Sequence, residues 1–267
     1  MVDFLRRCRR PVLVGLLVGL VAAGAVPAAQ AQVGRAATLP PVVGSAPAGP
    51  ATPALPVPAA PAAPRPPRLL PLFGGLTLPE AGRLVGAARL DAIAASFASR
   101  EEASAFLSTK GYEYLAEGQP DTAVYRLNLA WLLDPRNPAV YRGLGVVASS
   151  GPDASLAVRL LVQGLALAPT DALMLADLGS AHLLRFQQAH KKKDLAAGLA
   201  FLQRATATDP ANAVAWQQLA RAYSLGQQYP LAWQALHKSR ALSMATLDYD
   251  LVAELLAHQP DPQGLFK

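Results

Sequence analysis

Cysteine is almost missing from this chain of 267 residues. The only one, Cys8, stands before the apolar run Val12–Val26, so it cannot be the lipid-modified cysteine of a lipoprotein, which follows such a run. A mature chain without its leader would hold no thiol. Disulfides, cysteine nucleophiles and thiolate metal ligands are then excluded, and the composition suits an oxidising compartment.

An excess of positive charge is also missing from the part expected to fold. The net charge is +6, from 24 Lys and Arg against 18 Asp and Glu. Seven arginines and one aspartate lie in the first 77 residues: Arg6, Arg7, Arg9, Arg10, Arg35, Arg65, Arg68 and Asp3. Residues 78–267 therefore carry 17 groups of each sign. A neutral folded region lacks the positive field that nucleic-acid binding needs, so nucleic acid is not an expected partner.

Signatures of catalysis are absent as well. The sequence has no phosphate-binding G-x-x-x-x-G-K-S/T and no G-x-G-x-x-G. Its four histidines (182, 190, 237 and 258) are never three or four residues apart, so no helix presents a ready metal pair. His182 is expected to be a packed core residue. We predict no catalytic residue, no metal and no cofactor.

Residues 1–31 have the pattern of a secretory signal peptide. Arginines precede the apolar run, and Ala29-Gln30-Ala31 is typical of a cleavage site. We expect cleavage after Ala31 and export to the periplasm or cell envelope of a bacterium. The alternative is an uncleaved membrane anchor, although the run is short for a span of about 20 residues. Membrane contact is expected only if this segment is retained.

Residues 32–77 are rich in Pro and Ala, which predicts a disordered, extended spacer. A proline-rich ligand for another domain is the alternative. The sequence Leu72-Phe73-Gly74-Gly75-Leu76 is expected to mark where order begins, with its apolar side chains docked on the first helices.

Helical patterning starts at residue 78 and predicts one N-terminal helix over 78–98. Residues 104–137 and 138–171 then align with an offset of 34 residues. Two further units follow at 172–212 and 213–246, within an array that covers 99–246. Residues 247–267 are expected to form a C-terminal capping helix and a loose tail over 260–267. Each unit is a helix pair that cannot bury its own apolar face, so the copies must stack.

The spacing of these units resembles the tetratricopeptide repeat (TPR) family. The resemblance rests in the first two units on Leu107, Gly111, Tyr114, Ala123, Leu127, Ala130 and Pro135, then Tyr141, Leu144, Gly145, Ala157, Leu161, Gly164 and Pro169. Residues 121–135 are also similar to a group of exported bacterial repeat proteins with no assigned chemistry. The resemblance implies an all-α, right-handed α-solenoid of about four TPR helix pairs, with an extra N-terminal helix and a capping helix.

The family binds partners on its concave face, lined by positions 2, 5, 9 and 12 of each first helix. Carried onto this chain, the expected partner-binding residues are Tyr112, Arg142, Val146, Ser180, Leu183, Gln217 and Arg221. Ser108 and Tyr112 stand where members that grip a terminal carboxylate have Lys and Asn, so that ligand is not supported. An extended or helical apolar segment of a protein is expected instead.

The third unit contains a basic insert, which reads RFQQAHKKKD over 185–194. Its simplest interpretation is a lengthened first helix followed by a solvated basic loop. The alternative makes His190–Lys193 a landing site for an acidic partner or for membrane headgroups.

These features predict a non-enzymatic scaffold of the cell envelope that binds a protein or peptide in its groove. A chaperone-like or assembly accessory subunit is the alternative, and an enzyme is the less favoured third hypothesis.

Overall fold

The computed structural model describes residues 64–267, and all regular elements in this range are helical. The predicted signal peptide, Cys8 and the first part of the predicted linker lie outside the described residues. The helices are α1 (Leu72–Gly75), α2 (Leu78–Val85), α3 (Ala87–Ala94), α4 (Arg100–Ala116), α5 (Pro120–Leu133), α6 (Pro138–Ser149), α7 (Ala154–Leu167), α8 (Ala172–Ala189), α9 (Lys192–Thr208), α10 (Ala213–Leu225), α11 (Tyr229–Leu242) and α12 (Tyr249–His258), with short 3₁₀ helices η1 (Pro67–Leu69) and η2 (Met244–Thr246).

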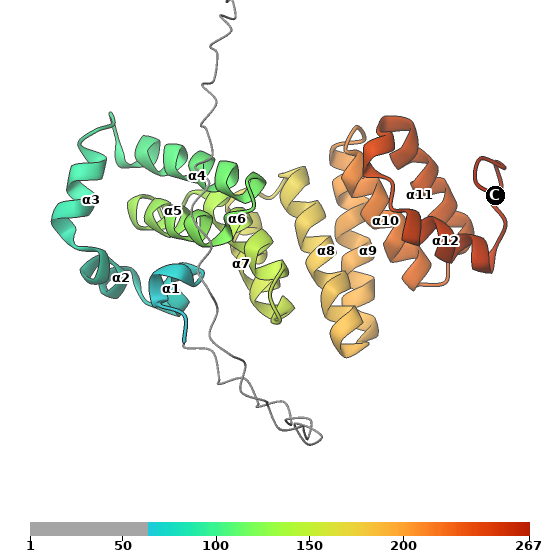
Figure 1. Cartoon of the computed structure of the whole chain (residues 1–267), viewed down its shortest axis with the longest axis horizontal. Helices are drawn as coiled ribbons and strands as arrows, with labels where there is room; N and C mark the ends of the chain where they lie inside the picture. The colour runs from blue at the N-terminus through green and yellow to red at the C-terminus, as the bar shows by residue number, and fades with distance from the viewer. Residues whose placement is uncertain (1–63) are drawn as a thin grey trace, which may run out of the picture. The chain divides into compact units, whose positions relative to one another are not determined.

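Helices α4 to α11 form four pairs, each first helix packed most extensively on the helix that follows it (Figure 1). The pairs stack in chain order through contacts such as α5 with α6 and α7 with α8. They correspond to the four predicted repeats, and the arrangement is the α-solenoid that the sequence predicts.

A polar cap starts the first helix of each later unit. Asn137, Asp171 and Asn212 precede α6, α8 and α10, and each side chain accepts a backbone N–H of the first turn. Such caps satisfy N–H groups that have no partner inside the helix. Asp248 does the same for α12, accepting from the N–H groups of Asp250 and Leu251. Helix α12 is therefore built like the first helix of a fifth unit, and it covers the last pair.

Glycine lets the two helices of a pair approach closely. A Cβ at Gly145 of α6 would lie 2.6 Å from Cγ of Leu161 on α7. In the α8–α9 pair both helices carry a glycine, because Gly179 faces Leu202 and Gly198 faces Leu183. These contacts leave no room for a larger residue, which explains the small residues at these repeat positions.

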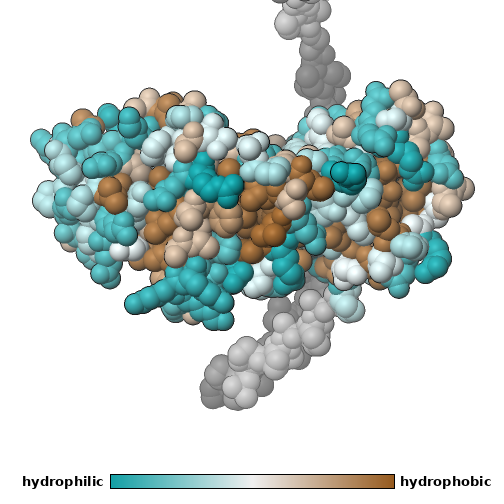
Figure 2. All heavy atoms as spheres, turned by 180° about the vertical axis from the view of Figure 1, so that it is seen from behind, coloured by the Kyte–Doolittle hydropathy of each residue, from teal (hydrophilic) through white to brown (hydrophobic). Residues whose placement is uncertain are grey.

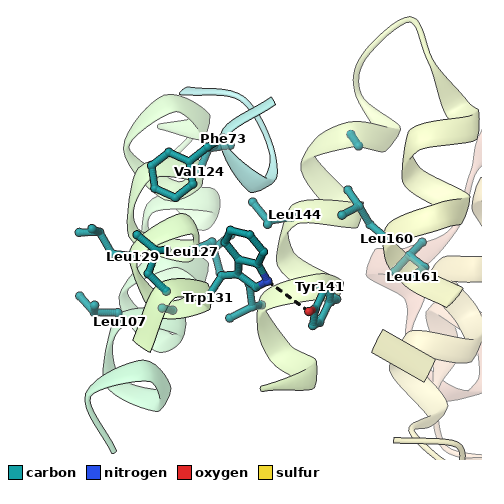
Figure 3. Close-up of a cluster of buried hydrophobic side chains, with 14 of the residues drawn as sticks. Phe73, Leu107, Val124, Leu127, Leu129, Trp131, Tyr141, Leu144, Leu160 and Leu161 are labelled. Carbon is teal, nitrogen blue, oxygen red and sulfur yellow. Dashed lines mark hydrogen bonds between the residues drawn. The ribbon is translucent and has the colours of Figure 1, made fainter. Parts of the chain in front are cut away.

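The N-terminal segment differs from its prediction. The range 78–98 holds two helices, α2 and α3, separated by Gly86 at φ 92°, a conformation that favours glycine. Phe73 is buried, but it docks on α5, with its ring 6.5 Å from that of Trp131 (Figure 3). The side-chain amide of buried Asn128 donates to the carbonyl oxygens of Arg68 (3.1 Å) and Leu70 (2.8 Å). These bonds attach the segment to the second helix of the first pair.

The C-terminal tail is held in place rather than loose. The carboxylate of Asp261 contacts Nε2 of His237 at 2.7 Å and accepts the N–H groups of Gln263, Leu265 and Phe266. The Phe266 ring stacks on His237 with 6.0 Å between centroids. Burial alone would raise the pKa of Asp261, but these hydrogen bonds outweigh it and hold the pKa below its usual range.

The insert lengthens both helices of the third pair. Helix α8 has 18 residues and α9 has 17, against 13 and 14 in the next pair. The prediction of a basic loop was wrong in one respect, because Lys192 and Lys193 form the first turn of α9. The connection is short because His190 takes the left-handed conformation that ends α8, with φ 51°.

Candidate functional site

The candidate site is the face formed by the first helices α4, α6, α8 and α10. On each of these helices, groove positions 2, 5 and 9 have spacings of three and four residues, which place them on one side of the helix. On α8 these are Leu173, Ala176 and Ser180. On α10 they are Val214, Gln217 and Arg221.

Three polar residues connect the first three of these helices. The Tyr112 hydroxyl of α4 donates to the carbonyl oxygen of Ala139 at 2.8 Å. The guanidinium of Arg142 on α6 lies 5.6 Å from the Tyr112 ring centroid. Its Nε donates to Oδ2 of Asp177 on α8 at 2.7 Å. We call Tyr112, Arg142 and Asp177 the N-terminal polar ladder.

Burial controls the electrostatics of this ladder. It raises the pKa of Tyr112 to about 12, with the positive charge of Arg142 opposing the shift. Burial also raises the pKa of Asp177, and Arg142 only partly offsets this effect. Asp177 lies inside α8, beyond its first turn, where no backbone N–H is free to bind its carboxylate.

A second set of polar contacts lies at the other end of the face. Arg221 of α10 forms an ion pair with Asp248, the cap of α12. Ser224 of α10 donates to Glu254 of α12. We call the two pairs, Arg221 with Asp248 and Ser224 with Glu254, the C-terminal polar pair set. The pKa of Asp248 is lowered, because hydrogen bonds from Leu251, Arg221 and Asp250 and the charge of Arg221 outweigh its burial.

Between the two polar sets, α8 and α10 meet through mostly apolar groove positions. Leu173 is 46% exposed and Val214 is 54% exposed, both at position 2 of their helices. Gln217 is buried, and neither its Nε2 nor its Oε1 has a hydrogen-bond partner among residues 64–267. We call Leu173, Ala176, Ser180, Val214 and Gln217 the apolar saddle.

The seven predicted site residues do not all lie free in the groove. Val146 and Ser180 are half-buried on the face, as expected of groove positions. Leu183 was wrongly placed in the groove, since it is only 3% exposed and packs over Gly198 in the core. Tyr112, Arg142 and Arg221 are on the face, but each bonds another part of the chain. The acidic partners of the two arginines were not predicted, because they belong to the next first helix.

His182 is also more than a core residue. Its ring stacks on Phe201, and its Nδ1 lies 3.2 Å from Oδ1 of buried Asp194, which Arg185 also contacts at 3.0 Å. Burial lowers the pKa of His182 despite the Asp194 carboxylate. In residues 64–267 no Ser, Thr or Cys side chain is hydrogen-bonded to a histidine. No group of three or more His, Cys, Asp or Glu in that range is arranged to hold a metal ion.

The surface also shows where apolar side chains are open to solvent. Seen from behind the view of Figure 1, hydrophobic residues gather near the middle of that side of the molecule and are bordered by hydrophilic ones (Figure 2). Among the described helices, none has the length and apolar character needed to cross a bilayer.

Comparison with known proteins supports the fold. No family model matches the chain, and no curated protein matches its sequence. The solved structure of PilF from Pseudomonas aeruginosa is 21% identical, covers 59% of this chain and 69% of that chain, and has a TM-score of 0.50. TTC0263, a TPR protein of Thermus thermophilus, is 20% identical over 60% of this chain and 93% of that chain, with a TM-score of 0.49. A MamA structure is 19% identical over 58% of this chain and 90% of that chain, with a TM-score of 0.43.

At this level of identity the likeness to PilF shows the fold alone. Together with the stacked helix pairs, it confirms the prediction of an all-α TPR solenoid.

Proposed function

We propose that this protein is a non-enzymatic scaffold that binds a segment of another protein on the face formed by its first helices. One observation carries the proposal: the apolar saddle exposes two apolar side chains, Leu173 and Val214, between two sets of polar residues that are already paired. Leu173 and Val214 expose about half of their surface on adjacent helices, α8 and α10. Burial of such side chains favours association with a partner by about 25 cal/mol for each Å² removed from water.

The pairing of the polar residues defines the partner's chemistry. Arg142 and Arg221 already have acidic partners inside the chain, so an acidic ligand would have to compete with Asp177 and Asp248. The saddle instead offers apolar side chains and the hydroxyl of Ser180, which bonds its own helix at Ala176. We therefore expect the partner segment to contribute apolar side chains, as a helix or extended strand laid in the groove.

Site-specific photocrosslinking tests this site. A photoreactive amino acid is placed at Leu173 or Val214 and, as a matched control, at Val162 of α7, which is 48% exposed on a second helix. The full chain is produced in its native host and irradiated. We expect the same protein adduct from both saddle positions and none from Val162. Equal adducts from all three positions would show that the saddle is not the site.

The exported location is part of the same proposal and rests on the pattern of residues 1–31. N-terminal sequencing of the protein from the envelope fraction tests it. We expect a sequence that begins after Ala31, whereas a start at Met1 would show a retained anchor.

The stability of the captured complex separates a scaffold from the alternative chaperone-like or assembly role. A scaffold should co-purify with one folded partner in a fixed ratio. Capture of unfolded chains alone, with release when they fold, would favour the assembly role.

A further inference from the structure

The lengthened α8–α9 pair creates a cavity away from the saddle. Helix α8 has five residues more than α10, which adds about 8 Å at 1.5 Å per residue. Figure 1 shows that the turn between α8 and α9 extends past the C-terminal end of α10. The cavity between them has a volume of about 510 Å³, within the range of sites that hold a ligand.

The inner wall of the cavity is apolar. Four half-buried side chains line it, from three helices: Phe186, Leu195, Leu199 and Leu225. The remaining lining residues include Ala196 of α9 and the turn residues Gln227 and Gln228. None of these belongs to the saddle or to either polar set.

The rim of the cavity is basic and has no acidic partner among the described residues. His190 and Lys192 line it, and their neighbours in sequence, Lys191 and Lys193, have exposed side chains. These three lysines make no ion pair within residues 64–267. Asp194 is the single acid between residues 178 and 208, and it is buried against His182 and Arg185. The N-terminal end of α9 adds its own partial positive charge.

We propose that this cavity is a second docking site, which takes a bulky apolar side chain flanked by Asp or Glu in a protein segment. The apolar wall matches the bulky side chain, and Lys192 on the rim, with Lys191 and Lys193 next to it in sequence, matches the flanking carboxylates. A membrane surface is the poorer occupant, because its headgroups would meet the lysines without filling the apolar cavity. The site does not depend on which partner the saddle binds.

Fluorescence anisotropy with a defined probe tests the proposal. The probe is a short fluorescein-labelled peptide of Glu, Phe and Leu, compared with one peptide in which Ser replaces Phe and Leu and another in which Gln replaces Glu. We expect the chain to bind the first peptide at low salt and both altered peptides far more weakly. Failure to bind the first peptide, or equal binding of all three, would overturn the proposal.

Two matched pairs of variants locate the binding. Ala196→Trp fills the cavity from an exposed position of α9, and Ala200→Trp adds the same bulk at an exposed position one turn away. Lys192→Gln removes a rim charge, and Lys238→Gln removes an exposed charge outside this cavity. We expect Ala196→Trp to weaken peptide binding at least about tenfold and Lys192→Gln about threefold, as suits one screened surface charge. The two controls should bind as the wild type does.

Further outcomes separate other occupants. Leu173→Ser should leave peptide binding unchanged, because the saddle is a different surface. If Ala196→Trp retains full affinity, the cavity is not the binding site. If the wild type binds phosphatidylglycerol vesicles but not the peptide, and Lys192→Gln weakens that binding, the basic rim contacts lipid and the proposal fails. Self-association that Ala196→Trp abolishes, without peptide binding, would assign the cavity to a second copy and also overturn it.

Discussion

The two arginine–aspartate pairs on the candidate face are exposed to a similar extent, but the pKa values of their aspartates are shifted in opposite directions. The side chains of Arg142 and Asp177 are 24% and 28% exposed, and those of Arg221 and Asp248 are 29% and 31% exposed. The pKa of Asp177 is nevertheless raised and that of Asp248 lowered. Two things differ: Asp177 is packed more deeply against neighbouring atoms, so burial dominates its pKa, and Asp248 caps α12 and accepts two N–H groups, whereas Asp177 lies within a helix. The ion pair at the start of α12 is therefore supported by the helix and by weaker desolvation, whereas Asp177 has only Arg142 to offset its burial.

The largest expected effect is that of Arg142→Ala. It leaves the Asp177 carboxylate half-buried without its counter-ion, so we expect the free energy of unfolding to fall by about 2 kcal/mol, between the values for exposed and buried pairs. Urea unfolding followed by circular dichroism measures it. The double variant with Asp177→Asn is the control, and it should recover part of the loss. A single variant as stable as the wild type would show that the ladder does not hold the repeats together.

Gln217→Leu should stabilise the protein, whereas Arg142→Ala should destabilise it. The Gln217 amide is buried between the two polar sets with no hydrogen-bond partner among the described residues. Replacing it with an apolar side chain of similar size should raise the free energy of unfolding by about 1 kcal/mol, because an unsatisfied polar group is removed. Gln218→Leu, at the half-buried neighbouring position, is the control and should change stability little. A loss of stability in Gln217→Leu would mean that the amide is satisfied in solution.

Arg221→Ala should cost less than Arg142→Ala, about 0.5 to 1 kcal/mol. Asp248 keeps its hydrogen bonds to the N–H groups of Asp250 and Leu251 when Arg221 is removed, so no carboxylate is left without a partner. The same urea experiment compares the two arginine variants directly. Equal losses would contradict the interpretation that the cap supports Asp248.

The repeat pattern predicted most of the fold, because close packing imposes residue size at a fixed period. Gly111, Gly145 and Gly179 recur with an offset of 34 residues, and each faces a leucine of the paired helix. The N-terminal segment was less predictable, since its position depends on a few individual contacts: Phe73 packs against Trp131, and Asn128 bonds two backbone carbonyl groups. The C-terminal tail depends in the same way on the hydrogen bonds of Asp261 and on the stacking of Phe266 against His237. Individual contacts of this kind leave no periodic signal in a sequence.

The positions of the candidate site residues were predicted, but their ion pairs were not. Register alone places Tyr112, Arg142 and Arg221 on the face. It does not show that Asp177 and Asp248 neutralise the arginines, because these acids are 35 and 27 residues further along the chain. An arginine at a groove position followed by an acid on the next first helix is a signal that would have indicated the pairing.

The smallest expected effect is on stability in acid, where Asp177 and Asp248 should make contributions that change with pH in opposite directions. A lowered pKa means that Asp248 contributes stability above its unfolded pKa, near 4, and that this contribution is lost as the pH falls through the folded pKa. A raised pKa means the reverse for Asp177: its contribution is present below about pH 4 and is lost as the pH rises through the folded pKa.

Urea unfolding of Asp177→Asn and Asp248→Asn, from about pH 6 down to about pH 3, compares the two groups. As the pH falls, the wild type should gain stability relative to Asp177→Asn and lose it relative to Asp248→Asn, by less than about 1 kcal/mol in each case. Parallel slopes for the two variants would show that the aspartates have the same environment. Opposite slopes would mean that acid weakens the attachment of α12 while the contact between α6 and α8 becomes less dependent on charge.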